Sequence, residues 1–362
     1  MTVASYFSGS YGEARAKFRA AATAAGARLV AYENSNVLAP NGDTLTTDVA
    51  VLGPEKAERV YFTTSATHGV EGFCGSGCQI GFFVDGIFEA APPNTKIIMV
   101  HAINPHGFAW VRRVNEDNVD LNRNFQDFSK PLPKNEQYGE LHPWLIPADW
   151  TGLAKIEADK QILAYQQKNG MMAFQSAVSG GQYTHPDGLF HGGTKPTWSN
   201  TTLRRILKEH VPAGTRKFAG MDYHTGLGPM GYGEPIFVNA EGAVAYPRAK
   251  AWYGPSVTNP QDGSSTSAVV TGTLPEAFSD LGPNVEVTAV ALEYGTQTVP
   301  EVMNALRGDH WLHARGEVDS PLGRALKRIM RDAFYTDTNP WKAAVYGRAA
   351  DFALRSFRGL AS

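Results

Sequence analysis

The strongest constraint on the fold is the alternation of short apolar runs with helical stretches along most of the chain. In the first hundred residues, the apolar runs have the length of strands and cover residues 27–32, 48–53, 60–65 and 96–101. An Ala-rich segment at 13–26 and a segment at 71–83 have the composition of helices. This alternation is typical of an α/β fold whose sheet is largely parallel and buried.

The same alternation continues in the rest of the chain. It predicts strands at 217–224, 234–239 and 285–294, and helices at 151–178, 200–210, 300–314, 321–334 and 340–358. The stretch 127–147 is predicted to be a surface loop, and the stretch 179–200 is predicted to be a loop of a length that is usually functional. No repeat or linker divides the 362 residues. We therefore expect one domain, with a loop insertion at about 127–200 and a helical C-terminal tail at about 321–362.

The composition excludes several classes of protein. The 33 Lys and Arg residues nearly balance the 35 Asp and Glu residues, so the chain lacks the basic excess of a nonspecific nucleic-acid binder. Only two cysteines occur, Cys74 and Cys78, which excludes a disulfide framework, and we interpret them as packed small residues rather than ligands. No secretory signal is visible, and no stretch approaches the roughly 20 apolar residues of a membrane span. We expect a cytoplasmic protein without nucleic-acid or membrane partners, and its oligomeric state stays open.

His68 and Glu71 form the only H-x-x-E pattern in the chain. A His and a Glu at this spacing can reach one metal ion if the chain turns between them, and Gly69 would make such a turn easy. The pattern follows the predicted strand 60–65, and ligands of α/β sheets bind where strands end. On spacing alone, a metal site and an ordinary hydrogen-bonded loop histidine are equally supported.

Three further residues lie at the ends of predicted strands. Alternation puts Asp222 and His224 on one face of their strand, where His224 could be a metal ligand, although a lone histidine is more often part of a core. Glu293 ends another apolar strand, and a carboxylate there is costly unless it is paired or functional. The position of Glu293 therefore favours a functional role.

The polar hexad 120–125 follows the pair Arg112 and Arg113. Arginine binds carboxylates through two parallel hydrogen bonds, so these residues could form an anion-binding site. Without further context, a solvated loop is the better interpretation.

Taken together and in this order, these segments resemble the DUF2817 branch of the M14-like zinc carboxypeptidase superfamily. The resemblance spans roughly residues 5–315 and is carried by the segments 67–72, 104–108, 113–115, 120–125, 181–188, 221–226 and 292–296. It implies a single α/β/α domain with a mixed, mainly parallel sheet of about eight strands.

The resemblance also implies roles for individual residues. One Zn²⁺ ion would be held by His68, Glu71 and His224, which leaves a fourth position for water. Glu293 matches the general base, and Arg113 matches the residue that polarises the scissile carbonyl. Asn122 and Arg123 match the pair that holds a substrate carboxylate, and Asp120 matches the partner of the first zinc histidine.

The implied function is a zinc-dependent hydrolase, metallocarboxypeptidase-like, that cleaves an amide bond next to a free carboxylate of a peptide or small molecule. One alternative is an N-acyl amino-acid amidohydrolase of the aspartoacylase type. A catalytically inactive binding protein is a further alternative, but every ligand and base position is filled.

One departure from the family concerns the mobile tyrosine that covers the substrate. The matching stretch 263–272 holds no tyrosine, and neither Tyr246 nor Tyr253 aligns with it. The loop 179–197 is rich in Gly, His and aromatic residues and lies between the second and third ligands. We expect it to form one wall of the substrate pocket, with Tyr183 or His185 facing the metal within about 10 Å. The alternative is a solvated surface loop.

Overall fold

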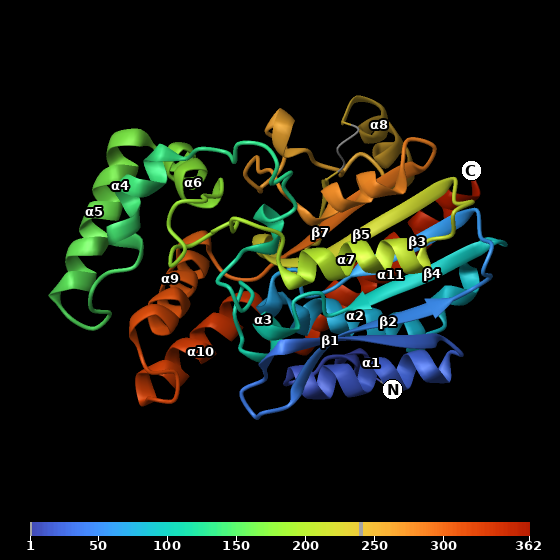
Figure 1. The fold of residues 1–362 in the computed structure, drawn as a ribbon, viewed down its shortest axis with the longest axis horizontal. Helices are drawn as coiled ribbons and strands as arrows, with labels where there is room; N and C mark the ends of the chain where they lie inside the picture. Colours follow the sequence, from blue (N-terminus) through green and yellow to red (C-terminus); the bar gives the residue numbers. More distant parts are fainter. Residues whose placement is uncertain (1, 239–241) are drawn as a thin grey trace.

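The fold is built on one sheet of seven strands. The computed structural model describes residues 2–238 and 242–362, and in this part of the chain the strand order is β1-β2-β4-β3-β5-β7-β6 (Figure 1). The strands are β1 (Arg28–Leu38), β2 (Thr44–Leu52), β3 (Arg59–Thr64), β4 (Thr95–His101), β5 (Lys217–Met230), β6 (Glu234–Phe237) and β7 (Glu286–Gly295).

The centre of the sheet is parallel and its edges are antiparallel. Strands β4, β3, β5 and β7 are parallel neighbours, whereas β1 and β2 on one side and β6 on the other join them in antiparallel pairs. The expected α/β class with a mixed sheet is confirmed. The described residues form seven strands rather than about eight, and the first predicted strand is longer than expected because β1 pairs with β2 well past Tyr32.

Helices cover both faces of the sheet. One face carries α1 (Tyr11–Ala24), α2 (Gly72–Val84) and α11 (Asn339–Ala361), and the other carries α7 (Trp198–His210) and the 3-10 helix η6 (Leu274–Leu281). The pleat of β3 shows the division, because Tyr61 packs on Phe82 while the adjacent Phe62 packs on Phe278 on the opposite face. Cys74 and Cys78 are buried free thiols of α2, as expected of packed small residues.

A group of helices extends beyond the carboxyl-terminal edge of the parallel strands. It contains α4 (Glu136–Leu145), α5 (Leu153–Asn169), α6 (Met171–Ser179), α9 (Val299–Arg315) and α10 (Pro321–Phe334) (Figure 1). The helix predicted at 151–178 is two helices, because Gly170 between them has a φ of +86°. The remaining helices are α3 (Pro105–Ala109), α8 (Gly242–Tyr253), η1 (Val3–Tyr6), η2 (Gly69–Glu71), η3 (Ile87–Ala90), η4 (Leu121–Arg123) and η5 (Pro260–Asp262).

The prediction of a surface loop at 127–147 is wrong over α4. The side chain of Asn135 accepts a hydrogen bond from the Tyr138 N–H and caps the helix. Tyr138, Leu141 and Leu145 are buried, so tertiary packing holds a helix where composition suggests a loop.

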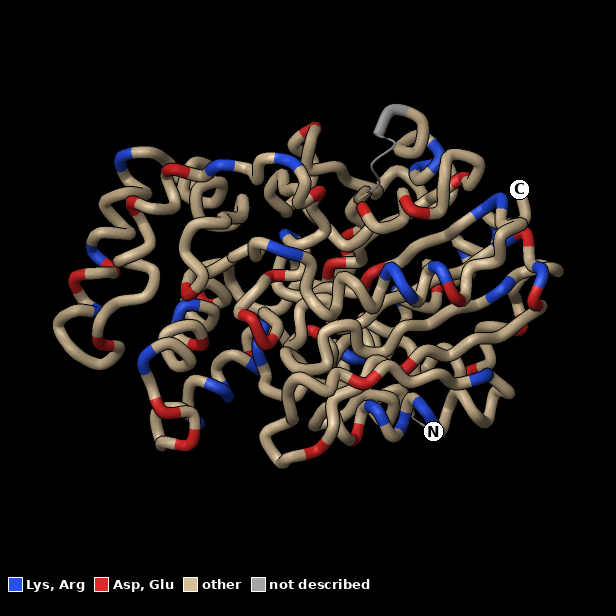
Figure 2. The backbone as a smooth tube through the Cα atoms, viewed as in Figure 1, with Lys and Arg blue, Asp and Glu red and all other residues tan. Residues whose placement is uncertain are grey.

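Positions of both charge signs are spread over all parts of the described backbone (Figure 2). Among the described helices, none is long and apolar enough to cross a membrane.

Candidate active site

The candidate site lies where the parallel strands end. His68 follows β3 by four residues, and His224 and Glu293 are register partners on β5 and β7. Neighbouring parallel strands end at the same edge of a sheet, which is where α/β proteins bind ligands. Strand pairing thus brings together three residues that are far apart in the sequence.

His68, Glu71 and His224 converge on one point. The Nδ1 atoms of His68 and His224 lie 2.9 Å and 2.8 Å from the two carboxylate oxygens of Glu71, and 3.2 Å from each other. All three residues are buried, and one ligand atom from each lies within 4.8 Å of the others. Two imidazoles and one carboxylate are a ligand set that catalytic zinc sites use.

Each of these imidazoles lies between two carboxylates. On the side away from Glu71, Nε2 of His68 lies 3.2 Å from Asp120 and Nε2 of His224 lies 2.7 Å from Asp222. Asp222 also accepts hydrogen bonds from two threonine hydroxyls, which fix its position. Carboxylates behind ligand histidines orient the ring and increase its basicity.

The arrangement fits a divalent cation. A neutral imidazole carries one N–H and can donate to only one of the two carboxylates that it faces. Burial lowers the pKa of His224, but Asp222 and Glu71 outweigh this effect and raise it well above its ordinary value. The carboxylates of Glu71, Asp120 and Asp222, with the guanidinium of Arg113, leave two negative charges around the imidazoles. A divalent ion at the convergence point would balance them.

Arg113 connects the ligand residues to the cavity wall. Its Nε donates to Asp120 at 2.9 Å and its Nη1 to Glu71 at 3.4 Å. The ring of Phe190 lies over the guanidinium at 5.1 Å. Burial lowers the pKa of Arg113, but Asp120 and Glu71 raise it by more, so the group keeps its charge.

The turn 68–71 is docked on the loop that leads to Arg113. The backbone N–H groups of Gly69 and Val70 donate to two carbonyls of that loop at 3.0 Å and 2.8 Å. A Cβ on Gly69 would lie 2.0 Å from the carbonyl carbon of Gly107. Gly69 has no positive φ, so the close approach of two backbones, rather than an easy turn, requires glycine here.

Glu293 lines the cavity beside the ligand residues. Its Oε1 accepts a hydrogen bond from the Leu227 N–H at 3.0 Å. Burial and the nearby Glu71 carboxylate raise the pKa of Glu293 to about 8, and a cation at the ligand residues would lower it. A carboxyl group whose pKa lies near neutral pH can take up and release a proton at physiological pH.

Asn122 and Arg123 lie at the same cavity, as expected. The Asn122 side chain is 3.4 Å from Nε2 of His224 and accepts a backbone N–H at 2.9 Å. Arg123 donates to the carbonyls of Asn122 and Ser179, and its Nε has no hydrogen-bond partner. Within the described chain, Arg123 forms no ion pair, and burial and Arg113 lower its pKa by more than the nearby Asp120 raises it. A buried cation without a carboxylate partner is suited to bind an anionic group of a ligand.

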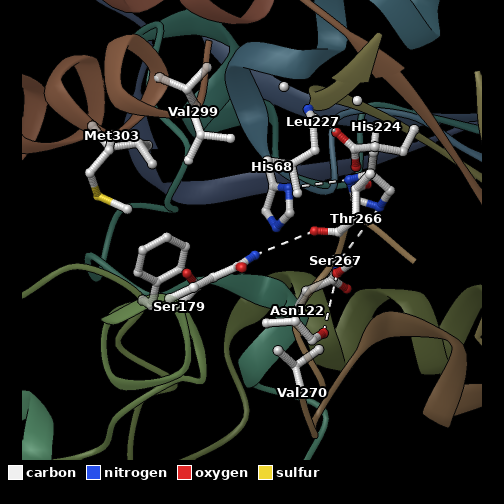
Figure 3. Close-up of a pocket in the computed structure, with 18 of the residues that line it drawn as sticks. His68, Asn122, Ser179, His224, Leu227, Thr266, Ser267, Val270, Val299 and Met303 are labelled. Atoms are coloured by element: carbon white, nitrogen blue, oxygen red, sulfur yellow. Dashed lines mark hydrogen bonds between the residues drawn. The ribbon is translucent and has the colours of Figure 1, made fainter. Parts of the chain in front are cut away.

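One cavity of about 1710 Å³ is lined by the candidate metal ligands and by Arg113, Asn122, Arg123 and Glu293. In Figure 3, His68 and His224 face each other near its centre. Asn122 and Val270 lie on one side of His68, and Val299 and Met303 lie on another (Figure 3). The cavity therefore continues away from the ligand residues in more than one direction.

Tyr183 or His185 was expected to face the metal, but neither residue is among those that line the cavity. The Tyr183 hydroxyl donates to the Arg123 carbonyl at 2.7 Å, and the His185 ring packs 4.2 Å from that of His142. The loop 179–197 still contributes to the wall through Phe190. Tyr183 therefore holds the backbone of Arg123 and is not part of the cavity lining.

No tyrosine is among the described residues that line the cavity. Tyr246 donates to Asp262 at 3.0 Å, and Tyr253 is buried against the Ser356 hydroxyl. Both are therefore occupied elsewhere in the fold.

Two parts of the site were not predicted from the sequence. Asp222 had no assigned role, although its alternation with His224 was a signal for it. The cavity wall formed by α5, α6 and α9 was also missed, and the adjacent apolar pair Met171 and Met172 was the only local signal. Such a wall depends on how separate helices pack, which a local pattern does not report.

A comparison with family models matches residues 7–348 to one family, described as protein of unknown function (DUF2817). No curated protein sequence matches the chain. Solved structures with similarity include carboxypeptidase A from Helicoverpa armigera, with 14% identity, a TM-score of 0.45, and coverage of 90% of this chain and 73% of that one. Murein-tripeptide amidase from Escherichia coli O157 has 14% identity, a TM-score of 0.37, and coverage of 83% and 91%. An aspartoacylase family protein from Mesorhizobium loti has 12% identity, a TM-score of 0.38, and coverage of 74% and 61%.

Proposed function

The chain belongs to the DUF2817 family of proteins of unknown function, and we propose that it is a zinc-dependent hydrolase that cleaves an amide bond next to a free carboxylate. The observation that carries this proposal is the position of His224 and Glu293 as register partners beside His68 and Glu71. One cavity holds the candidate metal ligands, a carboxyl group with a raised pKa and a buried arginine that has no ion pair with a described residue.

The metal site would be formed by His68, Glu71 and His224. A zinc ion bound there supplies a Lewis acid that polarises a carbonyl and lowers the pKa of water. Asp120 and Asp222 hold the two imidazoles with Nδ1 directed at the convergence point. Burial raises the pKa of Glu71, but His68 and His224 lower it to about 2, so Glu71 is an anionic ligand at neutral pH.

Glu293 is the proposed general base. It would take a proton from the attacking water and deliver it to the leaving nitrogen. The hydrogen bond from the Leu227 N–H fixes one oxygen, which leaves the other for this exchange. Arg113 would stabilise negative charge that develops on the carbonyl oxygen.

Arg123 and Asn122 would hold the carboxylate of the substrate. Arg123 is buried, charged and without an ion pair to a described residue, so a carboxylate would supply its missing partner. This places the scissile amide next to a free carboxylate. Both a peptide C-terminus and an N-acyl amino acid meet this requirement, since each releases an amino acid.

The test compares substrates that differ only in this carboxylate. Arg123→Ala should reduce kcat/KM for free-acid substrates about 100-fold or more and have little effect on their amides. Arg113→Ala should reduce kcat/KM equally for acids and amides, because Arg113 would stabilise the transition state of every substrate. Equal losses for acid and amide in Arg123→Ala would contradict the carboxylate requirement. Absence of bound zinc in the purified protein, with no turnover after zinc addition, would favour an inactive binding protein.

A further inference from the structure

The lining of the cavity contains more apolar than polar surface. The described chain exposes thirteen large hydrophobic side chains, and six of them line this cavity: Leu163, Met171, Met172, Met230, Val269 and Val299. Exposed apolar residues that gather in one place mark a binding groove, whereas scattered ones need no explanation. The cavity is therefore built to cover an apolar ligand surface as well as a carboxylate.

Three helices supply most of this surface, which we call the apolar wall and define as Leu163, Met171, Met172, Val299 and Met303. Val299 and Met303 are four residues apart on α9, so they share one helix face. In Figure 3 they lie on a different side of His68 from Asn122. The apolar wall thus continues from the metal site away from the carboxylate-binding pair.

An ion pair sets α5 beside α9. Asp159 on α5 and Arg307 on α9 are 2.8 Å apart. Leu163 lies one turn after Asp159, and Met303 lies one turn before Arg307, so both line the cavity next to the ion pair. The pairing also removes Asp159 and Arg307 as free charges for a ligand.

The other charged groups around the cavity are partnered as well. Glu276 accepts the backbone N–H groups of Gly272 and Thr273, and Glu301 accepts the backbone N–H of Thr298 as part of a capping box. Arg123 is the cavity-lining cation that has no ion pair with a described carboxylate. Arg123 is therefore the place in the cavity where an anionic group of a ligand can find a cationic partner.

We propose that the substrates are N-acyl amino acids with a long apolar acyl chain, which lies along the apolar wall while the amino-acid carboxylate binds Arg123. The inference rests on the proposed amide hydrolysis and names its substrate class. Water cleaves the C–N bond: its oxygen joins the acyl carbon to give a fatty acid, and its hydrogen joins the nitrogen to give the free amino acid.

The cavity volume favours a long acyl chain over a small acyl group, and the apolar wall favours an acyl chain over a peptide. The cavity volume of about 1710 Å³ exceeds the roughly 300–1,000 Å³ of ordinary ligand pockets, so a small acyl group would leave most of it unfilled. The backbone amides of a peptide on the apolar wall would lose hydrogen bonds to water without replacement. Methionine side chains are flexible and adapt to chains of different length.

The test measures hydrolysis of N-acetyl, N-hexanoyl and N-dodecanoyl glycine by the zinc-loaded enzyme, below micelle-forming concentrations. We expect kcat/KM to rise at least about tenfold from acetyl to dodecanoyl, because each methylene removed from water favours binding. Leu163→Gln and Met303→Gln should flatten this dependence. Leu153→Gln is the matched control, since Leu153 is exposed on the same helix but does not line the cavity.

Binding measurements test the apolar wall separately from the proposed hydrolysis. Calorimetry with Glu293→Gln should give tighter binding of N-dodecanoyl glycine than of N-acetyl glycine, and Leu163→Gln in that background should reduce the difference. Chain-length-dependent binding without turnover in the wild type would support the apolar wall and contradict the hydrolysis. Equal binding of short and long acyl chains, or a preference for peptides of matched hydrophobicity, would overturn the inference.

Discussion

His224 on β5 and Glu293 on β7 are register partners in the parallel part of the sheet. One is a candidate metal ligand and the other is the proposed base, so a rigid strand pair sets the separation of the two functions. Residues on paired strands are held more precisely than residues on loops. This geometry allows the two roles to be tested separately.

Replacing Glu293 with Gln should remove turnover without removing the metal. The amide is nearly the same size and can still accept the Leu227 N–H, but it cannot take a proton from water. We expect kcat to fall at least about 100-fold. Metal content, measured by atomic absorption, should stay at the level of the wild type. Loss of the metal instead would make Glu293 a ligand and place the base elsewhere.

The carboxylates behind the two imidazoles should determine metal affinity. Asp222→Asn and Asp120→Asn should each weaken zinc binding about 10- to 100-fold, because the ring loses the partner that orients it. Competition with a chromogenic chelator would measure the change. Asp48→Asn is the control, since this buried carboxylate binds Arg15 and does not line the cavity. Equal weakening in the control would indicate general destabilisation.

Gly69→Ala should destabilise the protein and disturb the metal site. The added Cβ would meet the Gly107 backbone at 2.0 Å, and neither backbone segment can move without breaking the hydrogen bonds that dock the turn 68–71. We expect a loss of at least about 2 kcal/mol in the free energy of unfolding, measured in urea. Gly347→Ala on α11 has open space around it and should be neutral or stabilising. Similar values for both variants would contradict the close-packing argument.

Asp309 should contribute stability that is lost in acid. Asp309 is buried. Its carboxylate oxygens lie 3.0 Å from Nε of Arg112 and 2.5 Å from Nζ of Lys327. Burial raises the pKa of Asp309, but Lys327 and Arg112 lower it well below its ordinary value. Because the folded pKa is the lower one, the contribution is complete well above the unfolded pKa of about 3.9 and is lost progressively as the pH falls from there toward the folded pKa.

Asp309→Asn tests this dependence. At pH 7 the variant should lose about 3 kcal/mol of unfolding free energy, because two buried cations lose their partner. Urea unfolding at pH 7 and at pH 3.5 should show the difference between wild type and variant shrinking in acid. A difference that stays constant with pH would mean that Asp309 acts through packing rather than charge.

The sequence by itself determined the class of the fold and the local part of the site. The α/β alternation, the buried runs of β3 and β5, and the pattern of His68 and Glu71 are set by residues close together in the chain. Strand and helix periodicities follow from backbone geometry, so they are visible in a local window. The resemblance to a known family added His224, Glu293 and Asp120, which the structure places together.

Only the tertiary structure decided which residues meet. His224 reaches His68 because β5 pairs with β3, and Asp222 becomes the partner of His224 because two threonines near the end of β3 hold it. Tyr183 turned toward the Arg123 backbone while Phe190 of the same loop entered the cavity wall. The direction of an irregular loop, and the packing of α5 against α9, depend on contacts between distant segments, which local composition does not encode.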